Sequence, residues 1–143
     1  MEFRSGTQDD QEWLYQLFRQ TMQEHIDAAW GWDELFQREG FATTLPASRF
    51  VILEQHGERL GCYYLSDKGK LLELDMMLVP PGQQRKGFGR RMIERIKERA
   101  SMTQLPVQLS VLQSNPAVRF YLALEFVEHS RDEHSLKLVW LPR

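Results

Sequence analysis

The feature that most constrains this chain is an apolar strand that leads through a basic, glycine-containing turn straight into an amphipathic helix, over residues 71–100. The turn holds Gly87 and Gly89, and its basic residues are Arg85, Lys86, Arg90 and Arg91. Glycine lets a ligand approach the backbone, and the first N–H groups of a helix favour an anion. The stretch therefore predicts either a phosphate-binding turn or a purely structural turn between strand and helix.

Two common phosphate motifs are missing from this turn. The sequence contains no G-x-x-x-x-G-K-[ST], and no G-x-G-x-x-G followed about 20 residues later by an acidic residue. The choice between the two readings of the turn must come from the rest of the chain.

Composition limits the classes of protein to which the chain can belong. Its 143 residues, 42% hydrophobic and 27% charged, suit a single globular domain over residues 1–143. No apolar run is long enough to span a membrane, and residues 1–4 do not resemble a signal peptide. We therefore expect a soluble, cytoplasmic protein without a membrane partner.

Net charge and the spacing of the histidines argue against two kinds of ligand, a nucleic acid and a metal ion. The formal net charge of −2 gives no overall basic field, so we expect no nucleic-acid partner. None of the four histidines has a partner at metal-ligand spacing, and we expect no metal. Cys62 lies in an apolar run, which favours a buried structural thiol over a nucleophile.

Periodicity predicts the order of the elements. Thr7 and Asp10 resemble a helix cap, the segment 55–58 resembles a hairpin turn, and Asn115 followed by Pro116 predicts the start of a short helix up to about residue 124. Strands are expected at residues 2–5, 49–54, 59–65, 71–79, 107–112, 125–130 and 135–141, and other helices at 9–29, 33–39 and 87–101. The strand–helix–strand unit over residues 71–112 should be parallel and right-handed.

An unusual group of aromatic and charged residues lies around the end of the first predicted helix: His25, Trp30, Trp32, Asp33, Glu34 and Phe36. Two tryptophans one residue apart do not easily share one face of a helix or strand. They can close the core beneath a surface loop, or they can line a small-molecule pocket. Asp33 can also simply cap the second helix.

Two motifs, together with this order of elements, resemble the GNAT superfamily of N-acetyltransferases. Residues 84–89, Gln-Arg-Lys-Gly-Phe-Gly, are similar to the Q/R-x-x-G-x-G/A acetyl-CoA signature of that family. Asn115, the pair Phe120-Tyr121 and residues 124–126 are similar to its second segment, N…FY…LGF. Glu125 stands where the family usually has glycine.

The resemblance implies a fold and a co-substrate. The fold is a mixed α/β (α+β) GNAT-like domain with a mostly antiparallel, twisted sheet of about seven strands and about four helices, split between the fourth and fifth strands. The co-substrate is acetyl-CoA. The implied contacts are Met77, Leu78 and Val79 for the pantetheine arm, Gln84, Arg85, Lys86, Gly87, Phe88, Gly89 and Arg90 for the pyrophosphate, with Asn115 and Tyr121 from the second segment.

The same resemblance implies catalytic roles. Tyr121 occupies the family's tyrosine position and is the candidate proton donor to the CoA thiolate. Glu73 and Asp75 share one face of their strand and both occur where family members place a basic carboxylate, although either can be a solvated outer-face residue. His25 and a water relay are further candidates for the base. An amine needs such a base because most of it is protonated at neutral pH.

The sequence thus predicts acetyl transfer from acetyl-CoA to an amine by direct attack. The alternative is a non-catalytic CoA-binding sensor or regulatory module. The first two helices help shape the acceptor site in the family, so His25, Trp30, Trp32, Asp33 and Glu34 are candidates for acceptor binding. The acceptor, a small molecule or a peptide, stays open, and edge strands near the C-terminus are compatible with a homodimer.

Overall fold

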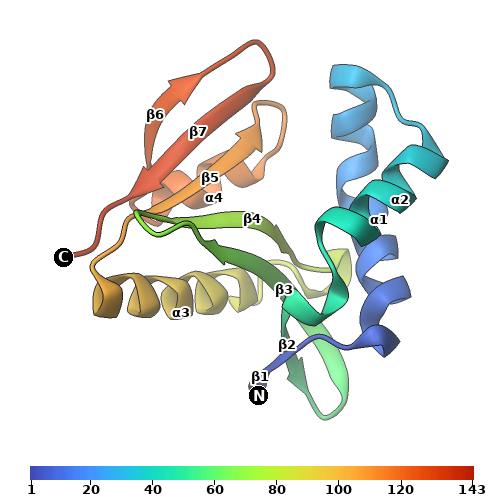
Figure 1. Cartoon of the computed structure of the whole chain (residues 1–143), viewed down its shortest axis with the longest axis horizontal. Coiled ribbons are helices and arrows are strands. Elements are labelled where there is room, and N and C mark those ends of the chain that lie inside the picture. The colour runs from blue at the N-terminus through green and yellow to red at the C-terminus, as the bar shows by residue number, and fades with distance from the viewer. The chain divides into compact units, whose positions relative to one another are not determined.

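The structure, a computed structural model, describes all of residues 1–143 and contains seven β-strands and four α-helices (Figure 1). The strands are β1 (Glu2–Ser5), β2 (Val51–Gln55), β3 (Glu58–Asp67), β4 (Leu72–Leu78), β5 (Val107–Leu112), β6 (Val127–Arg131) and β7 (Ser135–Trp140). The helices are α1 (Gln11–Trp30), α2 (Glu34–Thr44), α3 (Phe88–Thr103) and α4 (Ala117–Ala123), with short 3₁₀-helices η1 (Gln8–Asp10), η2 (Ala47–Arg49) and η3 (Pro81–Gln83).

The sheet has the strand order β1-β2-β3-β4-β5-β7-β6. The pairs β1–β2, β2–β3, β5–β7 and β6–β7 are antiparallel, whereas β4 and β5 are parallel. Pairing of β4 with β5 runs only from Leu72 with Val107 to Leu74 with Leu109, although both strands continue further. The predicted fold class, with its break between the fourth and fifth strands, is confirmed.

The chain divides into two compact units. The first comprises Met1–Tyr64 and Met76–Gly89, and the second comprises Leu65–Asp75 and Arg90–Arg143. Strands β3 and β4 each contribute residues to both units. The expectation of one domain over residues 1–143 stays a prediction.

The core of the first unit is formed by helices α1 and α2 and by three strands. Leu14, Tyr15, Leu17 and Phe18 of α1 are buried in one cluster that also includes residues of α2, β2, β3 and β4. Helix α2 continues to Thr44, beyond the predicted end at residue 39, because the Phe41 ring is buried against Phe18, with 4.8 Å between ring centroids. Packing therefore extends this helix past Gly40, which local preference alone disfavours.

Asp10 is the only buried charged or polar residue of the first unit and holds its N-terminal region together. It accepts the backbone N–H of Thr7 at 2.8 Å, which confirms the predicted capping arrangement. Its oxygens also accept two hydrogen bonds from Arg4, at 2.8 and 3.0 Å, and one from Arg59 at 2.8 Å. The hydrogen bond from Arg4 is the largest cause that lowers the pKa of Asp10.

The second unit buries one stripe of α3 together with the inner faces of β5 and β7. Met92, Ile93, Ile96 and Ala100 form that stripe. Lys97 on the same helix lies 5.1 Å from the centre of the Trp140 ring of β7. Glu125, after α4, has φ 75, a left-handed conformation that explains the family's preference for glycine at this position.

Most predicted boundaries agree with the structure to within about two residues, and the exceptions have local causes. The predicted strand 49–54 begins later, at Val51, because Ala47–Arg49 form η2. The predicted strand 125–130 begins at Val127, because Glu125 still belongs to the turn after α4. The hairpin turn is confirmed by His56 and Gly57, whose φ values of 52 and 77 suit a tight turn between twisted strands.

Candidate functional site

The turn between β4 and α3, residues 84–89, is exposed except for Phe88 and Gly89, which are half-buried. We call it the glycine turn. Arg85 and Gly87 have φ values of 66 and 87, so the backbone alternates in direction through the turn. The Gln84 side chain donates a hydrogen bond to the carbonyl of Val79 at 3.0 Å and so ties the turn to the end of β4.

The glycine turn presents backbone donors that the chain does not use. The N–H groups of Arg85, Lys86 and Gly87 have no acceptor within the protein, and the first turn of α3 contains no acidic residue. A Cβ atom on Gly87 would meet no atom within 4 Å. Unpaired N–H groups, open space and the positive end of a helix together fit a pyrophosphate.

The end of β4 leads into this turn. Leu78 is buried in the core cluster of the first unit, and Met77 and Val79 are half-buried on either side of it. Gln84 uses one of the two lone pairs of the Val79 carbonyl, so a pantetheine arm could share this acceptor or pair with other backbone groups here. The predicted pantetheine and pyrophosphate contacts that belong to the first unit, residues 77–79 and 84–89, thus lie in one continuous segment of the chain.

Glu73 and Asp75 lie on one face of β4, as predicted, while Leu72 and Leu74 are buried on the other. Glu73 is half-buried and accepts a hydrogen bond from Gln108 at 3.4 Å. Burial, with a smaller contribution from the charge of Asp75, raises the pKa of Glu73. Asp75 is exposed and accepts a hydrogen bond from Ser66 at 2.6 Å.

Tyr121, on α4, is buried, with 6% of its surface exposed. Its ring lies edge-on to Phe120 and Phe126, at 5.3 and 5.7 Å between centroids, and its hydroxyl has no hydrogen-bond partner within the protein. Burial raises the pKa of Tyr121. The hydroxyl therefore keeps its proton at neutral pH and can donate it to a ligand atom.

Asn115 caps the helix that carries Tyr121. Its side-chain oxygen accepts the backbone N–H of Ala117 at 2.9 Å, and its carbonyl accepts that of Val118 at 3.1 Å. The predicted cap is confirmed, although regular α-helical bonding begins at Ala117, one residue after Pro116. The motif residue Asn115 thus orients α4.

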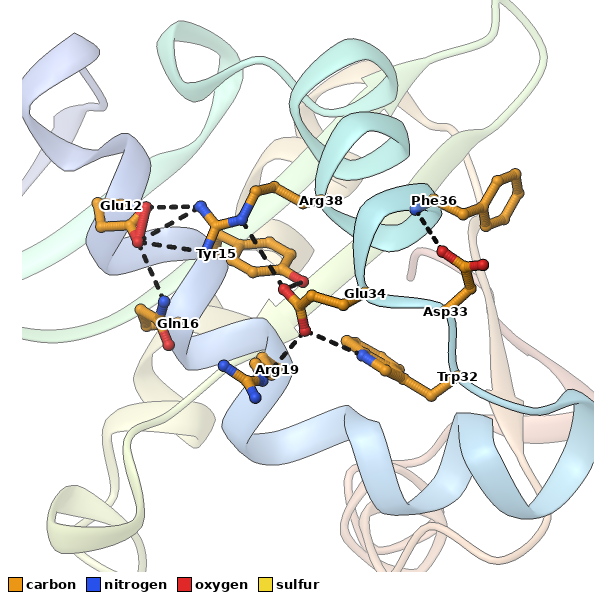
Figure 2. Close-up of polar contacts among 9 residues, drawn as sticks. All are labelled: Glu12, Tyr15, Gln16, Arg19, Trp32, Asp33, Glu34, Phe36 and Arg38. Atoms are coloured by element: carbon orange, nitrogen blue, oxygen red, sulfur yellow. Dashed lines mark hydrogen bonds and ion pairs between the residues drawn. The ribbon is translucent and has the colours of Figure 1, made fainter.

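Glu34 is the centre of a polar network that joins α2 to α1, as Figure 2 shows. It accepts hydrogen bonds from the Tyr15 hydroxyl at 2.6 Å and the Trp32 indole at 3.1 Å, and it pairs with Arg19 at 3.3 Å. These contacts, the one from Tyr15 foremost, lower the pKa of Glu34. Burial and the hydrogen bond to Glu34 raise the pKa of Tyr15 to about 12.

Of the other predicted acceptor residues, Trp30, Trp32 and Asp33 line a groove between the end of α1 and the start of α2, whereas His25 is not part of its lining. Asp33 accepts the backbone N–H of Phe36 at 2.9 Å, so it is the helix cap that the sequence allowed. His25 is half-buried on α1. The groove has a volume of about 520 Å³, and its lining includes Ile26, Trp30, Trp32, Asp33, Phe36 and Gln37.

The structure groups the predicted site residues by unit. The first unit holds the glycine turn, the end of β4 and the group from His25 to Glu34, and the second holds Glu73, Asp75, Asn115 and Tyr121. Sequence reasoning missed the partners Tyr15, Arg19 and Gln108, because no spacing signal connects residues so distant along the chain. It also left Phe36 and Gln37 out of the acceptor group.

Two further expectations concern Cys62 and the membrane. Cys62 is fully buried and burial raises the pKa of its thiol, so the predicted structural role is confirmed over that of a nucleophile. No helix is both long enough and apolar enough to cross a bilayer. No three His, Cys, Asp or Glu side chains converge in an arrangement that could hold a metal ion.

Comparison with known proteins gives a family and a fold. A family model described as an acetyltransferase (GNAT) domain matches residues 19–142. No curated protein sequence matches this chain significantly.

Several solved structures share the fold at low sequence identity. PaiA N-acetyltransferase from Thermoplasma acidophilum, in complex with coenzyme A, is 15% identical, with 98% of each chain covered and a TM-score of 0.79. The ribosomal-protein-S18-alanine N-acetyltransferase from Escherichia coli is 19% identical over 98% of this chain and 92% of its own, with a TM-score of 0.75. Spermidine N-acetyltransferase from Vibrio cholerae, with CoA and spermine, is 17% identical over 98% and 94%, with a TM-score of 0.70.

Proposed function

This chain belongs to the GNAT family of acetyl-CoA-dependent N-acetyltransferases, and we propose that it transfers the acetyl group to an amine by direct attack on the thioester. The observation that carries this proposal is the family match over residues 19–142, which includes both the glycine turn and Tyr121. Acetyl-CoA supplies an activated acetyl thioester. The glycine turn would hold its pyrophosphate through the N–H groups of Arg85, Lys86 and Gly87.

Glu73 is the better candidate for the base of the two strand carboxylates. It is half-buried with a raised pKa, whereas Asp75 is exposed and already accepts a hydrogen bond from Ser66. A carboxylate with a raised pKa is a stronger base toward an ammonium group. Glu73 would take one proton from the ammonium group, directly or through water, and so free the nitrogen lone pair that then bonds to the carbonyl carbon.

Tyr121 would donate a proton to the sulfur as the carbon–sulfur bond breaks. One observation supports this role: the Tyr121 hydroxyl, which is protonated at neutral pH, has no partner in the protein and so is available to a ligand atom. Asn115 orients the helix that carries Tyr121 and is a positioning residue in this scheme. The nitrogen loses two protons in all, one to Glu73 before attack and one to water as the amide forms, and the sulfur gains one from Tyr121. Proton exchange with solvent then restores Glu73 and Tyr121, with a net release of one proton.

The Tyr121→Phe variant tests the catalytic proposal against the alternative of a non-catalytic CoA-binding module. With acetyl-CoA and a panel of amines, we expect wild-type protein to release CoA thiol and the variant to lose about 100-fold in kcat. The CoA dissociation constant, measured by calorimetry, should stay the same. Tight CoA binding by wild type without release of thiol from any amine would instead support the binding module.

Glu73→Gln and Asp75→Asn form a matched pair that tests the choice of base. We expect Glu73→Gln to lower kcat/KM by about 100-fold and Asp75→Asn to change it by less than about threefold. In wild type, kcat/KM should rise with pH as Glu73 loses its proton, and this rise should be missing in Glu73→Gln. Equal effects of the two substitutions would contradict the assignment.

A further inference from the structure

The groove between α1 and α2 has an unusual lining for a protein surface. Trp30 and Phe36 are 62% and 71% exposed, and Ile26 and Trp32 complete an apolar wall. Its volume of about 520 Å³ falls within the range typical of small-molecule sites. Isolated exposed apolar residues need no explanation, but two exposed rings beside two half-buried apolar residues in one groove do.

The lining of this groove carries a negative charge and no positive charge. Asp33 is the only charged residue in its lining, and only one of its two oxygens is used, by the backbone N–H of Phe36. The nearby cations are committed elsewhere, since Arg19 pairs with Glu34 and Arg38 pairs with Glu12 at 2.9 Å. Figure 2 shows Asp33 and Phe36 apart from Glu34 and these arginines.

The groove packs on the same core cluster as the strand that would hold the pantetheine arm. Trp32 and Ile26 pack against the core cluster of the first unit, which contains Leu78 at the end of β4. The Trp32 ring lies 5.9 Å from that of Phe18, and its indole N–H is held by Glu34. Ile26 and Trp32 are therefore held in place before a ligand arrives, which lowers the entropic cost of binding.

We propose that the groove selects the acceptor as a small primary amine that carries one positive charge and one aromatic group. The proposal rests on the proposed function, because it names the substrate class of the acceptor side of that enzyme. Trp30 and Phe36 would contact the aromatic group, and the Asp33 carboxylate would favour the cationic amine. A polyamine has several charges and no aromatic surface, and an aromatic amino acid adds a carboxylate that Asp33 repels.

Three amines test separately the need for an aromatic group and the need for a single positive charge: 2-phenylethylamine, spermidine and phenylalanine. We expect kcat/KM for 2-phenylethylamine to exceed that for the other two by about tenfold or more. Calorimetry on the CoA-bound protein should show the same order of affinity. A higher kcat/KM for spermidine or phenylalanine would overturn the inference while it leaves the proposed function standing.

Variants of the lining supply the second arm of the test. Phe36→Ala should weaken binding of 2-phenylethylamine about tenfold, whereas Leu35→Ala, which removes a neighbouring side chain that is 66% exposed but outside the lining, should not change it. Asp33→Asn keeps the helix cap, because asparagine also caps well, and should reduce the discrimination against phenylalanine. Equal effects of Phe36→Ala and Leu35→Ala would overturn the inference.

Failure of the proposed function gives a different result. If no amine releases CoA thiol and CoA does not bind, the proposed acetyl transfer fails. Calorimetry with 2-phenylethylamine alone still decides the assignment of the groove: binding that Phe36→Ala weakens and Leu35→Ala does not supports it, and no measurable binding overturns it.

Discussion

The glycine turn and the segment of residues 30–38 both lead into a helix, but they use their polar groups in opposite ways. In the turn, the N–H groups of Arg85, Lys86 and Gly87 have no acceptor in the chain. In the segment, Asp33 caps α2 and Glu34 binds Tyr15, so most polar groups act within the fold. The turn is thus prepared for an anion from outside, whereas the segment offers a ligand mainly apolar surface.

This difference explains why the donor substrate is easier to recognise than the acceptor. A phosphate held by backbone N–H groups needs a particular backbone path, and glycine spacing records that path in the sequence. An acceptor held by the faces of Trp30 and Phe36 needs only side chains at the right places in space. Many different sequences can supply such a surface.

Among polar groups that act within the fold, Asp10 should show the largest effect. Asp10→Ala removes a buried carboxylate, 1% exposed, that binds Arg4, Arg59 and the N–H of Thr7. We expect the free energy of unfolding to fall by about 3 kcal/mol, measured by chemical denaturation. Asp9→Ala, at the exposed neighbouring position, should change it by less than about 0.5 kcal/mol.

The stability difference between wild type and Asp10→Ala should also depend on pH. Because the pKa of Asp10 is lowered in the folded state, its contribution is fully present above the pKa of an unfolded aspartate, about 3.9. It decreases as the pH falls further toward the folded pKa. The difference in unfolding free energy between wild type and Asp10→Ala should therefore shrink below about pH 4, and a difference that grows there would contradict the ion-pair assignment.

Gly87→Glu tests the glycine turn, whose backbone N–H groups have no acceptor within the chain. The new carboxylate would occupy the open space at Gly87 and repel a pyrophosphate, so CoA should bind at least about 100-fold more weakly by calorimetry. Gly69→Glu is the matched control, because Gly69 has the same φ of 87 and equally open surroundings in the turn before β4. Both variants should lose similar stability, and an equal loss of CoA affinity would show that strain, not the ligand site, is responsible.

Tyr15→Phe should have the smallest effect. It deletes only the hydroxyl that donates to Glu34, and we expect a loss of about 1 kcal/mol in unfolding free energy. Tyr64→Phe is the control, because Tyr64 is also buried but its hydroxyl makes no hydrogen bond within the protein. If the two variants lose the same stability, the network around Glu34 does not hold α2 against α1.

The sequence predicted the local backbone features of the glycine turn and of the start of α4 better than the side-chain contacts between α1 and α2. Glycine spacing located the turn, and Asn115 with Pro116 located the start of α4, because both signals are local backbone requirements. The end of α2 was wrong, because Phe41 is buried by residues that local preferences cannot see. Glu34 was named only as a candidate for acceptor binding, although the structure gives it Tyr15, Trp32 and Arg19 as partners.

By itself, the sequence determined the order of elements, since hydrophobic periodicity, capping residues and glycine positions act through neighbours along the chain. The resemblance of residues 84–89 and 115–126 to the family's motifs implied the fold class and acetyl-CoA as the donor. Only the tertiary structure decided how each carboxylate is used. Glu34 meets Tyr15 from 19 residues away, and Glu73 meets Gln108 from 35 residues away. Such contacts depend on packing between elements. The same packing leaves Asp33 and Phe36 in the lining of the groove, where we propose that they select the acceptor.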